Sequence, residues 1–418
     1  MAIATGIAKK LVIAQQAALG TIAAVDAASA VYLRRVSSNL DLKKDVYQSN
    51  EIRADMQIAD YRHGVRSVDG SISGELSPGT YQLLMAAILR KAWAAAPASG
   101  AESDVAAAVT SGNSGTFTSA ATATFLTDGL KVGDVVRWTG WTTTGEGNNS
   151  RNFLITALTE LVMTGTMLDG SPVVAKIAGD AVTATGVGKK CWTPSTGHTN
   201  LYFTVEHNYS DLDMSEVFTD CKPITMGFKL PATGMGTIDI GMMGLNMTDV
   251  SGASAPYFTG PAAAATGGVV AAVNGVIYVQ GAAVALITGM DFDIAGGQSA
   301  EPVVGSNYKP DIFDGRVQVK GNMTVFFQDA TFRDYFVDET EVSISAVFTC
   351  ANTATADFLA FTMPRVKVGG ASKDDGEKGL VMTMPFQALF DTGAGADTGA
   401  TATDSLATTL SIQDSTIA

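Results

Sequence analysis

The stretch Val68–Met85, VDGSISGELSPGTYQLLM, has a second version at Val319–Phe336, VKGNMTVFFQDATFRDYF. The two align without a gap, so that Gly70 stands opposite Gly321 and the apolar positions coincide. A constant spacing between ungapped segments is the sign of a duplicated structural unit. The sequence therefore predicts two copies of one unit, which are too few for a solenoid.

Each copy predicts a strand that leads into a helix. Gly64–Leu76 carries the apolar positions of a strand or hairpin, and Ser77-Pro78 follows directly. Serine can accept from the free amides of a first helical turn, and proline at the first helical position loses no hydrogen bond. Apolar residues then recur at helical spacing from Tyr81 to Trp93. The second copy keeps a shorter stripe, so we expect the helix of each copy to cover the same face of the same sheet.

The composition predicts a β-rich protein with a sizeable core. The chain has 418 residues, 46% of them apolar, only 16% charged, and 44 glycines that indicate many turns. Its 41 acidic and 27 basic residues give a net charge of −14. This balance argues against ordinary DNA binding, because phosphate contacts need clustered lysine and arginine. An acidic protein can still handle DNA by repelling it.

The three cysteines, Cys191, Cys221 and Cys350, form no CxxC pair and cannot all be bridged. Buried free thiols in a reducing compartment are the simpler interpretation. Near the N-terminus Gln15-Gln16 interrupts the apolar run that a signal peptide needs, and no stretch of eighteen apolar residues occurs. We therefore expect a soluble protein without a cleaved leader and without membrane contact.

No motif for catalysis, a metal ion or a cofactor is present in the sequence. HExxH, GxSxG and paired CxxC are missing. Gly186–Lys190 lacks the first glycine and the final serine or threonine of a phosphate loop. The aspartate pairs at 211–213 and 291–293 lack the glycine and distal glutamate of an EF-hand. We assign no catalytic, metal or cofactor-binding residue and expect no enzyme.

Composition divides the chain into three parts. An Ala/Ser/Thr/Gly-rich segment begins at Ala101, and short strand patterns follow it, which suits a small inserted β domain over 101–195. The first repeated unit then comprises 1–100 with 196–255, and the second comprises 256–418. Asn274-Gly275 predicts a hairpin within Val269–Val279, since this pair tolerates a type I′ turn. The late sequence LSIQ is a candidate for one further strand.

Asp45–His63 is polar and carries both signs of charge without a clear period. We expect a long loop between strands, and loops of this length are usually functional. A solvated loop with no partner is the alternative. A second polar excursion occupies Ala295–Asp314. The residues of the first excursion that we consider for contact with a partner are Asn50, Glu51, Arg53, Asp55 and Arg62.

Three blocks resemble the tail tube proteins, or major tail proteins, of phages with long non-contractile tails. The first is Tyr32–Tyr81, YLRRVSSNLDLKKDVYQSNEIRADMQIADYRHGVRSVDGSISGELSPGTY. The second is Gly197–Gly244, with HTNLYFTVEH, SEVFTDCK and LPATGMGTIDIGMMG. The third is Pro364–Asp391, PRVKVGGASKDDGEKGLVMTMPFQALFD. Together they cover most of the chain outside the predicted insert and the tails.

The resemblance implies a mainly β fold, with a β-sandwich or barrel and one flanking helix per unit. It implies subunits joined edge to edge into rings, rings stacked into a tube, and a genome that passes through without specific binding. It further implies a tape-measure protein and tail terminator or tip proteins as partners, assembly in the host cytoplasm, and a place in the virion. The usual subunit carries one unit and forms hexameric rings. Two units per chain therefore favour a trimeric ring, although a ring of six chains stays open.

Two physical arguments agree with the tube that the resemblance implies. An anionic lumen repels phosphate, and the loop with Glu51 and Arg53 can reach a neighbouring ring, where mixed charges set the register. We expect the insert to project outward, where its volume does not block the channel. The alternative function is a surface or secreted carbohydrate-binding or adhesive β protein, for which Trp138 and Trp141 are weak support because such a pair is more often core.

Overall fold

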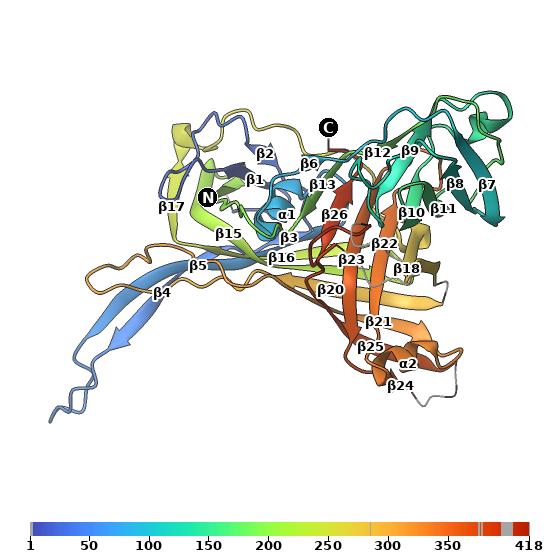
Figure 1. The fold of residues 1–418 in the computed structure, drawn as a ribbon. Coiled ribbons are helices and arrows are strands. Elements are labelled where there is room, and N and C mark those ends of the chain that lie inside the picture. Colours follow the sequence, from blue (N-terminus) through green and yellow to red (C-terminus); the bar gives the residue numbers. More distant parts are fainter. Residues whose placement is uncertain (1–2, 285, 375–376, 378, 394–403, 418) are drawn as a thin grey trace.

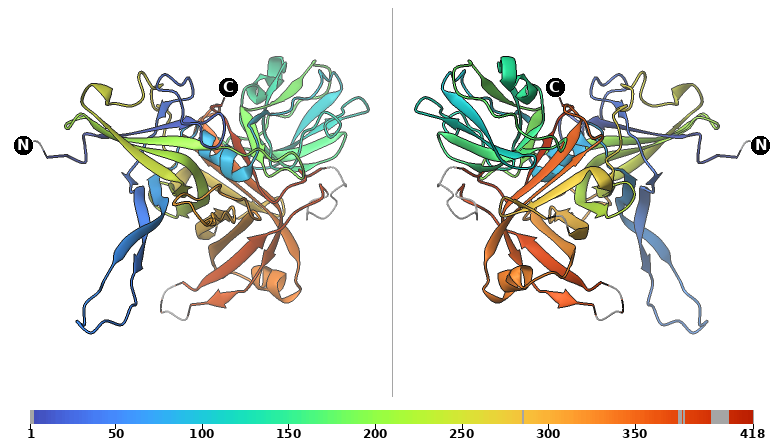
Figure 2. Two further views of the ribbon diagram at one scale, coloured as in Figure 1. Left: turned by 90° about the vertical axis from the view of Figure 1, so that its left-hand side faces the viewer. Right: turned by 90° about the vertical axis from the view of Figure 1, so that its right-hand side faces the viewer.

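A computed structural model describes residues 3–417 except 285, 375–376, 378 and 394–403. The protein is mainly β, as the composition predicts, and the described residues include two α-helices (Figures 1 and 2). A long hairpin projects from the main body at one end, and a separate small sheet lies at the far end (Figure 1). The described part of the chain also contains three 3-10 turns: η1 (Thr143–Asn148), η2 (Gly252–Ser254) and η3 (Ala272–Asn274).

The longest strand, β15 (Met214–Pro231), belongs to two sheets. Its first half pairs in one sheet with four other strands, which are β2 (Val31–Tyr32), β1 (Lys9–Gln15), β14 (Phe203–Tyr209) and β17 (Asn246–Ser251). Its second half lies in what we name the long sheet. The order there is β3 (Ser37–Ser38) with β4 (Asp41–Gln48), β5 (Tyr61–Glu75), β16 (Thr237–Gly244), β15, β20 (Ile287–Ala295), β21 (Gln318–Phe326), and β25 (Val381–Ala388).

Beyond β25 the long sheet reaches the end of β23 (Phe358–Val368) and the short β24 (Ser372–Lys373). The first half of β23 turns into a further layer. That layer contains β22 (Glu341–Thr349), β18 (Gly275–Val279), β19 (Ala282–Ala283), β26 (Ser411–Asp414), β13 (Lys189–Trp192) and β6 (Ala94–Ala95). The predicted strand at LSIQ is thus confirmed as β26.

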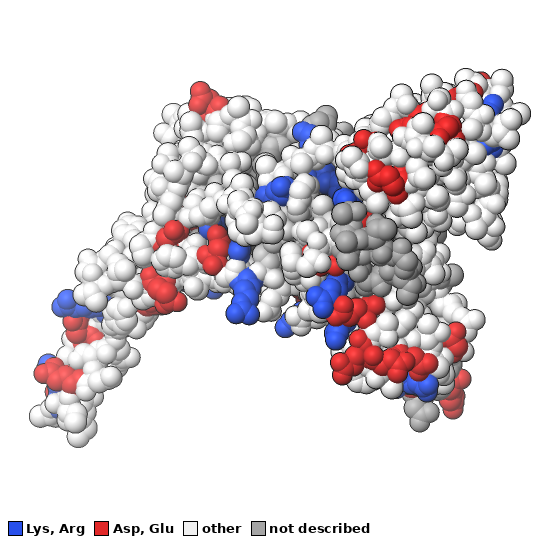
Figure 3. Space-filling view, viewed as in Figure 1, with Lys and Arg blue, Asp and Glu red and all other residues white. Residues whose placement is uncertain are grey.

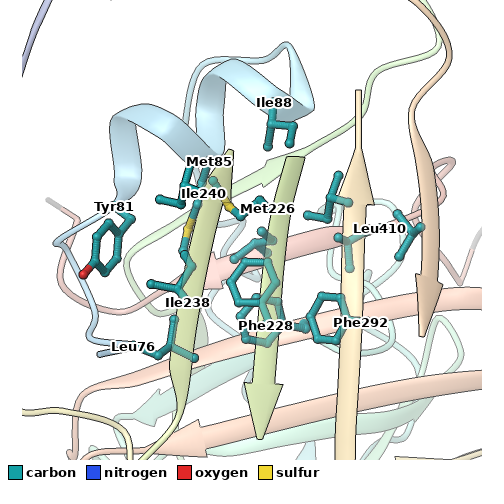
Figure 4. Close-up of a cluster of buried hydrophobic side chains, with 14 of the residues drawn as sticks. Leu76, Tyr81, Met85, Ile88, Met226, Phe228, Ile238, Ile240, Phe292 and Leu410 are labelled. Carbon is teal, nitrogen blue, oxygen red and sulfur yellow. The ribbon is translucent and has the colours of Figure 1, made fainter. Parts of the chain in front are cut away.

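Side chains of the long sheet alternate between an apolar and a polar face, as the period of two in a strand requires. The apolar face joins the main core, with Phe228 of β15 and Phe292 of β20 stacked at 4.8 Å. Phe361 of β23 packs edge-on against both rings. Figure 4 shows this core between the sheet and the helix above it. The sheet therefore buries one side against the rest of the protein.

Two series of strands share one order of pairing. The first series is β4, β5, β16, β15, β14 and β1, and the second is β20, β21, β25, β23, β22 and β18. The repeated stretch occupies matching places, because Gly70 pairs with Met242 and Gly321 with Phe386. The shared order is consistent with two tandem units. Their boundaries at 1–100 with 196–255 and at 256–418 stay a prediction.

Helix α1 (Gln82–Leu89) is shorter than the predicted stripe. The Ser77–Thr80 segment forms a turn in which the two hydroxyls bond to each other at 2.6 Å. The helix ends at Arg90, whose φ of 59° is left-handed, so Trp93 lies outside it. Leu84 to Leu89 are all buried, and α1 packs on β15 and β13. The second helix, α2 (Thr331–Val337), packs on β23 and buries no residue fully.

A separate six-stranded sheet lies within residues 105–186. Its order is β12 (Thr183–Gly186), β9 (Val135–Thr139), β10 (Phe153–Leu158), β11 (Val162–Met167), β8 (Ser114–Ser119) and β7 (Val105–Ser111). It has its own hydrophobic core. Strand β13, which falls within the predicted insert of 101–195, pairs instead with β26 and β6 outside this sheet.

The small sheet packs against the second series rather than the first. Val135 and Leu154 share a cluster with Val347 and Phe358. The Gln413 side chain of β26 accepts from the Val135 amide at 2.9 Å and donates to two carbonyls at 2.8 Å. The small sheet belongs to the first half of the chain in sequence, yet β26, the last strand of the second half, holds it in place.

The predicted hairpin at Asn274-Gly275 is wrong. Asn274 ends η3, and Gly275 has a φ of −88°, which a type I′ turn does not allow. The turn lies at Gln280-Gly281 instead, where φ is 48° and 70°, and joins β18 to β19. An Asn-Gly pair tolerates such a turn but does not impose it, and here tertiary pairing of β18 with β22 decides the position.

Candidate assembly surface

The β4–β5 hairpin projects beyond the rest of the long sheet (Figure 1). Strand β16 ends where Gly244 pairs with Val68, and β4 and β5 continue together as far as the Gln48–Tyr61 pair. The expectation of a loop over all of Asp45–His63 is therefore wrong at both ends. Cross-strand pairing extends into the polar sequence because Val46 and Tyr47 suit a strand. Only residues 49–60 form the connecting loop.

All five predicted contact residues lie on this hairpin and are exposed. The Arg53 guanidinium donates to Asp55, with one N–O distance of 2.9 Å, and lies 3.9 Å from Glu51. Arg62 is not part of this group, because it donates to Asp60 at 2.7 Å near the strand end. Asn50 begins the loop. The structure thus brings Glu51, Arg53 and Asp55 together, with Arg62 placed apart.

These ion pairs are local and solvated. The hydrogen bond from Arg53 holds the pKa of Asp55 below its usual value, and Arg62 does the same for Asp60. Such exposed pairs add little to stability. Figure 3 shows both signs of charge along the projecting hairpin. The hairpin therefore presents both signs of charge at fixed places, and a partner surface with the opposite arrangement of charges can match them.

The sequence interpretation missed three apolar side chains at the tip. Ile52 and Met56 are 101% and 96% exposed, and Ile58 is 65% exposed. Met56 also has a positive φ of 56°, at the turn of the loop. The alternation of apolar and charged residues from Glu51 to Asp60 was the available signal. Exposed apolar groups gathered on a projection are typical of an interaction site.

The polar face of the long sheet is the second candidate surface. Between β3 and β21 it carries the carboxylates of Asp41, Asp69, Glu75, Asp239, Asp291 and Asp293 and the amines of Lys43, Lys229 and Lys320. Burial, followed by the neighbouring Asp291, raises the pKa of Asp293. This face is therefore acidic and otherwise built from small polar residues.

One group of side chains outside these surfaces has the composition of a hydrolytic triad. Ser38 Oγ lies 2.7 Å from Nε2 of His207, and the His207 Nδ1 lies 3.7 Å from Glu216 Oε2. The second distance is too long for a hydrogen bond, and burial lowers the pKa of His207. The imidazole is thus not oriented by the carboxylate, and this geometry gives no support for nucleophilic catalysis.

The remaining candidates for chemistry are structural in this fold. Cys191 and Cys221 are buried free thiols, and burial raises the pKa of Cys191 to about 12. Trp138 and Trp141 lie in the core of the small sheet at 0% and 2% exposure, so they offer no sugar-binding surface. Across the described part of the chain, no cluster of three or more His, Cys, Asp or Glu residues suits a metal ion.

The comparison with protein families decides the identity of the fold. A family model described as phage tail tube protein matches residues 6–403. The chain belongs to this family. A search of curated proteins finds no match. As a tail tube protein it is a virion component built for self-assembly, and its described helices include none long and apolar enough to cross a membrane.

Proposed function

We propose that this tail tube protein forms rings that stack into a tube, with the polar face of the long sheet turned toward the lumen. The main support is the alternation of that sheet, which buries one face in the core and presents carboxylates on the other. An acidic wall repels the phosphates of DNA, so the genome can pass without binding. The tube assembles in the host cytoplasm together with a tape-measure protein and terminator or tip proteins.

Three chains close one ring in this proposal. The two series of strands share one order of pairing, so three chains supply six similar sectors. Light scattering tests this number. A trimer of the 43.2 kDa chain has a mass of about 130 kDa, and a ring of six chains has twice that mass.

The β4–β5 hairpin makes the contact between stacked rings. Its tip combines exposed apolar groups with a charged group of Glu51, Arg53 and Asp55. Burying Ile52 and Met56 against a neighbouring ring removes apolar surface from water and supplies affinity. The charges then fix the position of the tip on its partner.

Two variants of the tip test this contact. Reversing the charges of Glu51 and Arg53, or replacing Ile52 and Met56 by serine, shortens or abolishes tubes in electron micrographs while the circular dichroism spectrum is kept. Ile177→Ser is the matched control, because Ile177 is 82% exposed in the segment that leads to β12, in the part of the chain that we expect to project outward. Tubes of unchanged length from both tip variants contradict the contact, and a wild-type protein that never forms rings contradicts the tube itself.

A further inference from the structure

The long sheet ends in two edges that no strand of the described chain covers. One edge is the outer side of β3 and β4, which pair only with β5. The other is the side of β24 that faces away from β25. They lie at opposite ends of the sheet (Figures 1 and 2). Exposed edges with unpaired backbone groups promote pairing with another chain.

The structure contains an internal example of how such edges join. The second half of β15 pairs antiparallel with β20, from Thr225 with Ala295 to Pro231 with Gly289. This is the only junction in the long sheet between the first series and the second, within the described residues. In it, Phe228 stands opposite Phe292.

Strand register identifies the counterpart of β20 at the first free edge. Phe292 of β20 pairs with Gly321 in the second copy of the repeat. Its counterpart is Leu40, which lies between β3 and β4 against Gly70, the glycine that aligns with Gly321. Leu40 and Phe292 are both buried in the main core. The outer edge around Leu40 therefore occupies the place that β20 has in the second series.

The same argument identifies the counterpart of β15 at the second free edge. Phe228 of β15 pairs with Ile238, and Ile238 pairs with Gly74. In the second series Lys373 of β24 pairs with Met382, and Met382 pairs with Val325, the position that aligns with Gly74. Lys373 thus takes the place of Phe228.

We propose that β24 of one copy pairs antiparallel with β3–β4 of a second copy, in the register that sets Lys373 opposite Leu40 and Ser372 opposite Asp41. This junction repeats between chains the β15–β20 junction within the chain. It rests on the ring of the proposed function and specifies which edges and which residues close it.

The direction of the backbone groups agrees with this register. In an antiparallel ladder, alternate residues direct N–H and C=O to the same side. The amide of Asn39 bonds to the Ser71 carbonyl of β5, so Leu40 and Leu42 direct their N–H and C=O groups to the free edge. The Leu42 amide donates there to Asp41 Oδ1 at 2.8 Å, a bond that pairing with a second strand replaces. The amide of Asp374 bonds to Val381 of β25, so Ala371 and Lys373 direct theirs outward. The pairs Lys373–Leu40 and Ala371–Leu42 are then the hydrogen-bonded ones.

Cysteine cross-linking tests the register. Ser372 and Asp41 form a pair without mutual hydrogen bonds, in which side chains lie closest. Both residues are exposed, and the strands that carry them, β4 and β24, lie at opposite edges of the long sheet (Figure 1). The variants Asp41→Cys and Ser372→Cys are mixed, assembled and oxidised. We expect a disulfide-linked dimer of twice the chain mass on a denaturing gel, and no dimer from either variant alone.

A displaced pair serves as the control. Lys43 lies on the same face of β4 two residues from Asp41, so Lys43→Cys mixed with Ser372→Cys gives at least fivefold less dimer. Rings that form normally but cross-link only the displaced pair, or neither pair, overturn this junction and leave the tube intact. Wild-type protein that forms no rings instead overturns the proposed function.

A proline variant keeps the junction testable if a cysteine variant misfolds. Ala371→Pro removes an outward amide without removing a bond to β25. We expect a monomer with the wild-type circular dichroism spectrum and no rings. Normal rings from this variant contradict the pairing.

Discussion

Replacing Gln413 by leucine tests whether the small sheet is fastened by the last strand. The Gln413 side chain is 2% exposed and makes three hydrogen bonds, two with Val135 and one with the Val187 carbonyl. Leucine preserves most of the volume and removes all three. Each bond contributes about 1 kcal/mol, and a buried amide left without a partner costs about 1–3 kcal/mol more. We therefore expect the free energy of unfolding to fall by about 4–6 kcal/mol in total.

Urea denaturation measures the loss, and hydrogen exchange locates it. The amides of β9 and β12 exchange faster in the variant, while those of β10 and β11 inside the small sheet keep their protection. Gln387→Leu is the matched control, because Gln387 lies exposed in β25, and it changes stability by less than about 0.5 kcal/mol. A loss below about 1 kcal/mol for Gln413→Leu, or faster exchange spread evenly over the protein, refutes the fastening by β26.

Three other variants probe the core, the helix end and the ion pairs. Phe228→Ala removes a ring packed against two others and lowers the free energy of unfolding in urea by about 4 kcal/mol, and a loss under 2 kcal/mol contradicts the packing. Arg90→Ala removes two guanidinium bonds to backbone carbonyls, at 2.6 and 2.7 Å, and costs about 3 kcal/mol, whereas exposed Arg333→Ala costs little. Burial opposes ionisation of Asp169, but the hydrogen bonds from Arg151 dominate and lower its pKa. The ionised Asp169 therefore stabilises the fold above about pH 3.9, the ordinary pKa of an aspartate, and this stabilisation is lost on acidification. The variant Asp169→Asn is therefore less stable than the wild type at pH 7, and its melting temperature changes less between pH 5 and pH 2. An equal change of melting temperature in the two proteins contradicts the pairing.

The repeated stretch carried most of what the sequence could predict about the fold. Its strand became β5 and β21, its glycines marked close backbone approaches, and its apolar positions filled the core. Gly70 and Gly321 show why: a Cβ at either would press on the neighbouring strand, at Leu40 and at Asp291. Local sequence reports such constraints directly, because they arise within one or two strands.

The passage of β15 from its sheet with β14 and β17 into the long sheet was not predictable in this way. Met214–Pro231 is one continuous strand with irregular pairing near Asp220, whose φ is 55°, and after Pro223, and the sequence does not show that the partners on each side change there. The docking of the small sheet onto Gln413 was equally hidden, since it depends on residues 278 positions apart. Partners distant in sequence leave no local periodicity.

The two polar excursions show how similar positions diverge once tertiary contacts differ. Both follow the first strand of their series, yet only residues 45–63 form a projecting hairpin. The second excursion is tied to the body, because Lys222 donates to the carbonyl of Ile312 at 3.0 Å and Tyr202 donates to Asp311 at 2.6 Å. Arg90 adds its bonds to Gly296 and Gly315 on either side.

This difference has a consequence for the proposed tube. A ring of three chains with six similar sectors carries a projecting hairpin in only three of them, at alternate positions. Loosening the second excursion by Tyr202→Phe with Lys222→Met removes two of its anchors and leaves the bonds from Arg90. The change creates no apolar tip like that of the β4–β5 hairpin, since the exposed Val304 stands without the charged group that surrounds Ile52. Stacking is then expected to keep threefold rather than sixfold symmetry in averaged images of tubes. Sixfold density between rings of the wild-type protein contradicts a contact made by the β4–β5 hairpin alone.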